Sequence, residues 1–170
     1  MHQTALVGLW SAAGDASTLA RQRNMGELDS AGKTLLHRAA GSLFSGDGPS
    51  VTFSFGPNAG TARIDGTVAG TVAVEIESRV PKQIRGALLD LILHPYPSKL
   101  LVLLPVHTGN ASTAVRQAGI ILGHFLKPER FRVVVVQGSY EESLAAIRDA
   151  LLQLGVDLGA VQLPEPESAS

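Results

Sequence analysis

The stretch 61-TARIDGTVAGTVAVEIES-78 decides the fold of this chain. Two strands are predicted over residues 61–68 and 71–78, and the tight connection at Val68-Ala69-Gly70 pairs them as an antiparallel hairpin. If the turn centres near Gly70, Asp65 lies opposite Glu75. Side chains alternate along a strand, so Glu77 shares a face with Glu75, and the apolar residues Val72, Val74 and Ile76 point the other way, into the core.

The flanking sequence extends this hairpin into a larger sheet. A further strand is predicted at 51–55, followed by a loop over 56–60, and a helix over 25–41 precedes them. After the hairpin we expect a helix from Pro81, a strand at 100–106, a helix at 111–126, a strand at 131–137 and a last helix from Ser139 or Tyr140 to Leu154. The meander requires antiparallel pairing and the later strand–helix–strand unit favours parallel pairing. The sequence therefore predicts an α/β protein with a mixed β-sheet flanked by helices.

Composition indicates one domain. The chain has 170 residues, of which 45% are hydrophobic and 17% charged. We expect the domain over residues 25–163, an N-terminal arm of uncertain structure over 1–24, and a disordered tail over 164–170. There is no cysteine, which excludes disulfides and thiolate metal sites. The beginning of the chain lacks the basic region of a signal peptide, and its apolar runs are short, so a soluble, cytoplasmic protein with no membrane partner is expected.

Three acids on one face of the hairpin need an explanation. Like charges that face each other across a sheet are destabilising, and crowded carboxylates raise one another's pKa. A hard divalent cation would offset this, and Mg²⁺ prefers oxygen ligands. Such a cation can activate water and neutralise charge on a phosphate. The alternative is an exposed hairpin face that carries ordinary solvated acids.

Asp65, nine intervening residues and then Glu75-Ile76-Glu77 resemble the signature of the PD-(D/E)xK, or restriction endonuclease-like, nuclease superfamily. The order of elements over about residues 25–154 is similar to the core of that superfamily. The sequence departs from the signature where Ile64 replaces proline and where Glu77 replaces the motif lysine. A minority of type II restriction enzymes is similar in having glutamate in the lysine position.

The resemblance implies a restriction endonuclease-like fold and a metal-dependent endonuclease, such as a type II restriction enzyme, that hydrolyses DNA phosphodiester bonds. It implies Mg²⁺ or Mn²⁺ bound by Asp65, Glu75 and the backbone carbonyl of Ile76. Glu77 would then act on the attacking water or on a second metal. Restriction enzymes that read palindromes are two-fold dimers, so a homodimer is expected beside the DNA partner.

Further charged residues lie near these acids in the sequence. Lys82 could supply the missing positive charge of the motif, or be a surface lysine. Glu27 is similar to a further metal-linked glutamate of some superfamily members, or is a solvated acid at a helix start. Arg79, Lys82 and Arg85 are candidate DNA-binding residues, because phosphate contacts need such groups beside the metal. The alternative is that these cations balance the neighbouring acids.

Other features point elsewhere. Gly32-Lys33-Thr34 matches the end of a phosphate-binding P-loop, but Glu27 stands where that motif requires its first glycine. Gly119 and Gly123, one helical turn apart, favour close helix packing in the core over packing in a dimer. The net charge of −1 argues against a protein that coats DNA. Together with the missing lysine it leaves a second function open: a non-catalytic binding or assembly module with the same fold.

Overall fold

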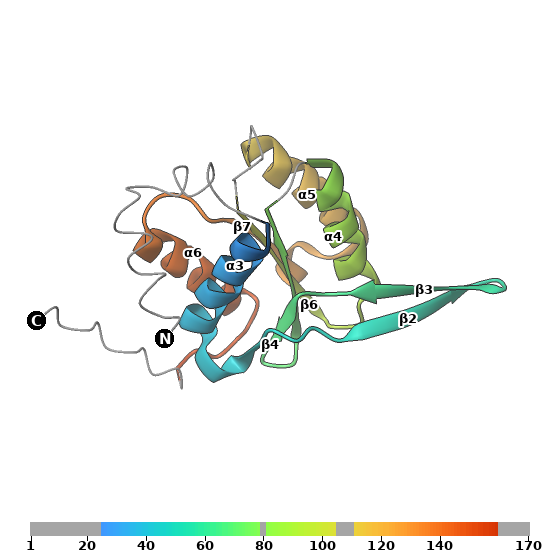
Figure 1. The fold of residues 1–170 in the computed structure, drawn as a ribbon, viewed down its shortest axis with the longest axis horizontal. Coiled ribbons are helices and arrows are strands. Elements are labelled where there is room, and N and C mark those ends of the chain that lie inside the picture. The colour runs from blue at the N-terminus through green and yellow to red at the C-terminus, as the bar shows by residue number, and fades with distance from the viewer. Residues whose placement is uncertain (1–24, 79–80, 105–110, 160–170) are drawn as a thin grey trace, which may run out of the picture.

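The computed structural model describes residues 25–78, 81–104 and 111–159 (Figure 1). The predicted arm over 1–24 and the predicted tail over 164–170 lie outside the described residues. The elements are α3 (Met25–Ala40), η1 (Gly41–Leu43), β1 (Phe44–Ser45), β2 (Ser50–Phe55), β3 (Asn58–Arg63), β4 (Gly66–Val68), β5 (Val72–Glu77), α4 (Pro81–Leu93), β6 (Ser98–Leu103), α5 (Ala111–Phe125), η2 (Pro128–Arg130), β7 (Phe131–Val135) and α6 (Tyr140–Gln153).

The main sheet has five strands in the order β1-β4-β5-β6-β7. β1, β4 and β5 pair antiparallel, whereas β5, β6 and β7 are parallel. The β-rich sequence VAVEIE forms β5, and SKLLVL forms β6; both strands are buried along their whole length. The predicted mixed α/β sheet is therefore confirmed, and the change from antiparallel to parallel pairing falls at β5.

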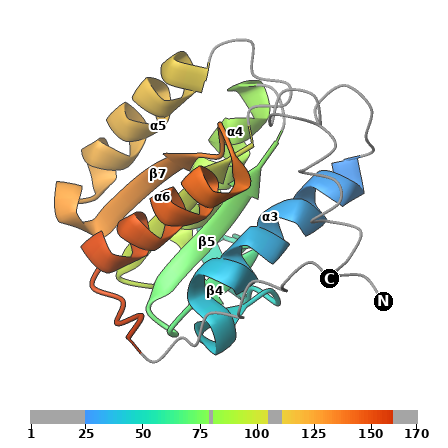
Figure 2. The same cartoon turned by 90° about the vertical axis from the view of Figure 1, so that its left-hand side faces the viewer.

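Two helical layers cover this sheet. α3 and α6 lie on one face (Figure 2), where the core includes Leu36, Val74, Val102 and Ile147. α4 and α5 lie on the other face, where the core includes Leu88, Leu101, Ala118 and Leu122. Because side chains alternate along a strand, β5 sends Val72, Val74 and Ile76 to the α3–α6 side, as predicted. Ala73, Glu75 and Glu77 face the α4–α5 side.

One strand prediction was wrong. Residues 61–68 do not form a single strand, because the chain bends at Asp65 and divides into β3 and β4. β3 pairs only with β2, in a separate two-stranded sheet that projects from the body (Figure 1). The predicted loop over 56–60 is also shorter, since Asn58 already pairs with Phe55 around a two-residue turn at Gly56-Pro57. Gly56 has a φ of +58°, as glycine commonly does at the first position of such a turn.

β4 is flanked at the edge of the main sheet by β1, a two-residue strand that the sequence pattern did not predict. Phe44 pairs with Val68 across this short ladder. At Gly66 a Cβ atom would lie 2.5 Å from the carbonyl oxygen of Ser45 and 2.6 Å from the Phe44 ring. Only glycine allows β1 to approach β4 this closely. The residue after the bend at Asp65 is therefore Gly66, which has no side chain to clash with β1.

Of the helices that the structure describes, none is long and apolar enough to cross a membrane.

Glycine plays opposite roles in α3 and α5, and this predicts opposite effects on stability. At Gly32 a Cβ would lie 2.5 Å from Cγ2 of Ile76, whereas at Gly119 it would meet nothing within 4 Å. The expectation that Gly119 serves core packing is therefore wrong.

We expect Gly32→Ala to lower the free energy of unfolding by about 1–3 kcal/mol through overpacking. Gly119→Ala should raise it by roughly 0.5–1 kcal/mol through helix propensity. Urea unfolding of both variants tests this, and equal effects would contradict the packing of α3 on β5.

Candidate functional site

The carboxyl groups of Asp65 and Glu75 face each other across the start of β4. The ladder pairs Gly66 with Val74 and Val68 with Val72, so its centre falls at Gly70, as predicted. Asp65 lies outside this ladder, in the bend before β4, and its N–H donates to the carbonyl of Val74, the partner of Gly66, over 3.1 Å. The N–H of Ile76 donates to Oδ2 of Asp65 over 2.8 Å. Two hydrogen bonds to β5 therefore fix the Asp65 backbone and its carboxylate.

Glu75 is the most perturbed acid of this pair. Its side chain is 7% exposed, and its Oε1 atom is buried without a hydrogen-bond partner. Burial first, and then the charge of Asp65 and a hydrogen bond between the two carboxyl groups, raise the pKa of Glu75 to about 10. The charges of Asp90 and Glu77 add to the same effect. Glu75 must therefore keep a proton at neutral pH or gain a cation that replaces the proton.

Two more acids flank the pair. Glu77 lies two residues along β5 on the same face and is 1% exposed. Asp90, on α4, is half-buried and accepts a hydrogen bond from the backbone N–H of Arg63. Burial and the charge of Asp65 raise the pKa of Asp90, against that hydrogen bond. The sequence analysis did not place Asp90 at the site. Its signal was weak but present, because Asp90 stands three residues after Ala87 and directly before Leu91 at the edge of a buried helical stripe.

This donor set suits a hard divalent cation. Every side-chain donor is a carboxylate oxygen, and the partnerless Oε1 of Glu75 is the atom that a cation would satisfy. Among the described residues, however, no three acidic or histidine side chains are grouped closely enough to form a metal cluster. A metal ion here would be held by Asp65 and Glu75, with backbone oxygen or water completing its shell. Mg²⁺ is commonly bound in this way, by one or two carboxylates and several waters.

The structure describes only part of the other predicted site residues. Arg85 is exposed on α4, and Ile76 is 3% exposed with its side chain in the core on the α3–α6 face. Lys82 lies in the first turn of α4 and Glu27 in the first turn of α3, but their side chains are not among those that the structure describes. Arg79 lies outside the described residues. The structure therefore brings Asp65, Glu75, Glu77 and Ile76 together and leaves the predicted cations untested.

A buried lysine on the same face belongs to a different cluster. Lys99 is 2% exposed, and its Nζ atom donates to the carbonyl of His94, 2.5 Å away, at the end of α4. Burial alone lowers the pKa of Lys99 to about 8, with no carboxylate acting against this shift. His94 in turn stacks on Tyr96 and has its Nε2 atom 3.1 Å from the carbonyl of Pro49. Lys99 therefore caps the C-terminus of α4 and does not replace the motif lysine.

The Gly32-Lys33-Thr34 segment has structural partners. Lys33 donates to the carbonyl of Gly46 over 2.8 Å, and Thr34 donates to that of Ser30 over 2.9 Å. Gly32 lies where α3 packs against Ile76. The resemblance of this segment to a P-loop is thus explained by helix packing.

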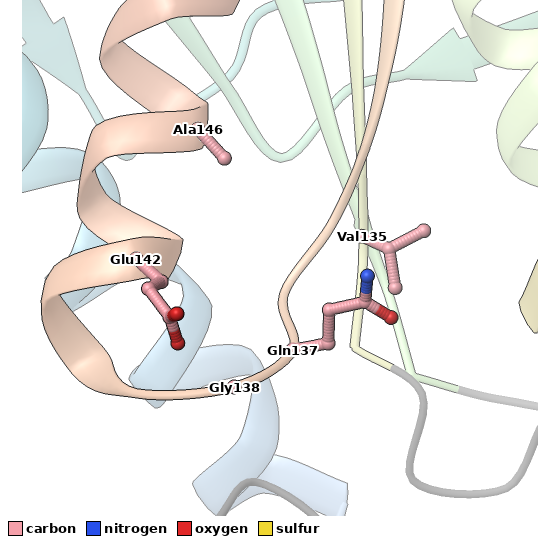
Figure 3. Close-up of a pocket in the computed structure, with 5 residues that line it drawn as sticks. All are labelled: Val135, Gln137, Gly138, Glu142 and Ala146. Atoms are coloured by element: carbon pink, nitrogen blue, oxygen red, sulfur yellow. The ribbon is translucent and has the colours of Figure 1, made fainter.

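A cavity of about 520 Å³ opens at the other edge of the sheet, between the end of β7 and the start of α6 (Figure 3). It is lined by Val135, Gln137, Gly138, Glu142 and Ala146. Glu142 already accepts a hydrogen bond from the N–H of Ser139, and the Ser139 hydroxyl accepts one from the N–H of Glu142. The α6 terminus therefore caps itself, so its first backbone N–H groups are already engaged.

Comparisons of this chain with protein-family models, with curated proteins and with solved structures found no match.

The raised pKa of Glu75 predicts how stability depends on pH when no metal is present. An unfolded glutamate loses its proton near its ordinary pKa of 4.5, whereas folded Glu75 holds it up to about 10. The free energy of unfolding should therefore fall as pH rises from about 5 to 10. Glu75→Gln keeps the shape and removes this titration, so we expect it to be at least about 1.4 kcal/mol more stable than the wild type at pH 8.

Urea unfolding in EDTA at pH 5, 6.5 and 8 measures this difference. The exposed Glu129 provides the control, since Glu129→Gln should follow the wild type at every pH. A Glu75→Gln difference that stays constant with pH would mean that Glu75 is ionised in the folded protein.

Proposed function

We propose that this protein is a metal-dependent endonuclease that hydrolyses phosphodiester bonds of DNA. The observation that carries the proposal is the pair of facing acids, in which Glu75 is buried, has an oxygen without a partner and lies within hydrogen-bonding reach of Asp65. Keeping such a pair is costly for stability, and costly buried polar arrangements are concentrated at functional sites. The resemblance of 65–77 to the PD-(D/E)xK signature supports the same chemistry.

Each acid has a distinct role in this proposal. Asp65 and Glu75 hold the metal, and the N–H of Ile76 keeps the Asp65 carboxylate in place. The carbonyl of Ile76 is the proposed backbone ligand. When bound, Mg²⁺ or Mn²⁺ supplies charge neutralisation at the scissile phosphate and eases deprotonation of water. Glu77 would accept the proton of the attacking water, whose oxygen bonds to phosphorus as the P–O bond in line with it breaks, and the leaving oxygen would take a proton from solvent.

Positive groups around the acids would hold the DNA backbone. Arg85 is exposed on α4, the helix that also carries Asp90. Arg79 and Lys82 are proposed to lie beside the same phosphates, and Glu27 remains a proposed additional metal-linked acid. A basic group is required close to the carboxylates, because the net charge of −1 does not by itself attract DNA.

Cleavage of DNA is the direct test. We expect the wild type to cut plasmid or branched DNA with Mg²⁺ or Mn²⁺, and Asp65→Asn and Glu75→Gln to lower the rate at least about 100-fold. Glu77→Gln should lower the rate while leaving metal affinity near that of the wild type, because its proposed role is in the chemical step. Glu129→Gln serves as the control on an exposed acid.

Two results would decide against this assignment. One is the absence of cleavage in every substrate with either metal. The other is cleavage that persists in both Asp65→Asn and Glu75→Gln, since the activity would then come from another site or from a contaminant. Discrete fragments from plasmid DNA would identify a restriction enzyme.

Metal binding can be measured without any substrate. At pH 7.5 Glu75 keeps its proton in the metal-free protein, because its pKa is about 10. A cation bound at Asp65 and Glu75 must displace that proton. Titration calorimetry with Mn²⁺ in two buffers of different ionisation enthalpy should therefore report about one proton released per ion. Glu75→Gln should release none, and a wild type that binds Mn²⁺ without releasing a proton would place the metal elsewhere.

A second candidate function is a non-catalytic binding or assembly module. It is favoured by the replacement of the motif lysine by Glu77 and by the lack of a three-ligand metal cluster among the described residues. A wild type that binds DNA or a protein partner, but neither binds Mn²⁺ at Glu75 nor cuts DNA, would support this candidate. The homodimer is also still a prediction, and light scattering of the same preparation tests it.

A further inference from the structure

The β2–β3 hairpin has two chemically different faces. Cross-strand pairs place Val51 beside Ala62 and Phe53 beside Gly60 on one face. The other face, here called the polar face, is formed by Ser50, Thr52, Ser54, Thr61 and Arg63, with Ala59 near the tip. The polar face thus carries four hydroxyl groups and one guanidinium, and residues 50–64 contain no acid. A hairpin with this pattern is amphipathic in a chain whose net charge is slightly negative.

The apolar face attaches the hairpin to the body. Ala62 is fully buried, and β3 contacts α4. Farther out, the Phe53 ring covers Gly60, where a Cβ would lie 2.5 Å from its Cζ atom. Side chains of the polar face point the opposite way, and Thr52, Ser54, Thr61 and Arg63 are exposed. The polar face is therefore directed to solvent along a hairpin that stands clear of the two helical layers (Figure 1).

The root of the hairpin lies close in the chain to the carboxylate pair, because β3 ends at Arg63, two residues before Asp65. Thr61, Arg63 and Asp65 alternate with the buried residues Ala62 and Ile64. The backbone N–H of Arg63 also donates to Asp90, whose charge acts on Glu75. A nucleic acid whose phosphate reached Asp65 and Glu75 would therefore pass the root of the hairpin first.

We propose that the β2–β3 hairpin enters a groove of duplex DNA and contacts it through the polar face. This inference rests on the proposed function, because DNA is the polymer that the carboxylate pair would engage. A two-stranded ribbon fits the major groove, and serine and threonine hydroxyls bond to phosphates and to base edges alike. Six residues per strand span about 20 Å, enough to follow the groove for several base pairs. Arg63 contacts a phosphate at the groove edge, and the hydroxyls of Thr52 and Thr61 lie deeper.

The test compares DNA binding by hairpin variants of the full chain. All are made in an Asp65→Asn background, which removes one repelling charge and, under the proposed function, cleavage. A fluorescent 30-base-pair duplex is titrated in EDTA, and anisotropy is read over a series of salt concentrations. We expect Thr52→Val with Thr61→Val to weaken binding about tenfold, as the loss of two hydrogen bonds predicts. Arg63→Gln should lower the slope of log affinity against log salt by about one.

Matched controls separate contact from folding. Valine keeps the β-branched shape of threonine, so the hairpin should form in the double variant. Thr71→Val makes the same change at an exposed threonine between β4 and β5 and should bind as the parent does. Equal affinities for the parent and all hairpin variants would overturn the inference. So would a loss of affinity that accompanies dissociation of a dimer in light scattering, since the hairpin would then contact a second copy.

The outcomes also separate this inference from the proposed function. If the parent binds DNA through the hairpin but the wild type never cuts, the inference holds and the nuclease fails. If the wild type cuts and the hairpin variants bind normally, the nuclease holds and the inference fails. A parent that binds no DNA would overturn the inference, whether or not the wild type cuts.

Discussion

β5 is the strand on which the other elements of this structure depend, because it is covered on both faces and yet carries two carboxylates into one of them. Burying an ionised carboxylate without a partner costs several kcal/mol, so such a group is protonated, paired or bound to a cation. Burial, and then the charges of the neighbouring acids, raise the pKa of Glu75, and one oxygen of its carboxyl group has no hydrogen-bond partner. The Glu75 carboxyl group on the α4–α5 side of the sheet must therefore bind a proton or a cation.

The bend at Asp65 reconciles the main sheet with the hairpin. If residues 61–68 ran straight, β3 would continue β4 and extend the main sheet beyond the body. The bend sends β4 into the sheet and leaves β3 outside, and it turns the Asp65 carboxylate onto the N–H of Ile76. One local departure from strand geometry therefore positions a candidate ligand and separates the core from a projecting arm. Irregular backbone beside a functional site is a common arrangement.

Other buried polar groups of the structure show why the acid pair stands out. Lys99 is as buried as any core leucine, but it donates to the carbonyl that ends α4, so its charge serves the helix terminus. The cavity beside α6 is polar, but Glu142 and Ser139 satisfy each other there. Glu75 differs from both because its nearest partner is another acid. This chemistry, and not the fold, distinguishes the candidate site, because one fold by itself supports many activities.

The sequence by itself determined the local elements and the face on which the acids lie. Helical stripes predicted α3, α4, α5 and α6 to within a few residues, and the period of two in 71–78 placed Glu75 and Glu77 together, opposite the core residues Val74 and Ile76. The centre of the turn at Gly70 predicted the register of β4 against β5, because antiparallel register follows from the turn. It thereby brought Asp65 near Glu75, although Asp65 itself lies outside the ladder.

Tertiary structure decided what local periodicity does not encode. The two-residue β1 depends on contacts between segments far apart in the sequence, such as Phe44 with Val68. The bend at Asp65 depends on its hydrogen bonds to Val74 and Ile76 of β5. The contribution of Asp90 depends on how α4 packs over β5, which brings its carboxylate near Asp65. The perturbed pKa of Glu75 likewise arises from burial under a helix layer that no strand pattern specifies. Sequence spacing identified the candidate carboxylates, and tertiary packing determined the free-energy cost of burying them.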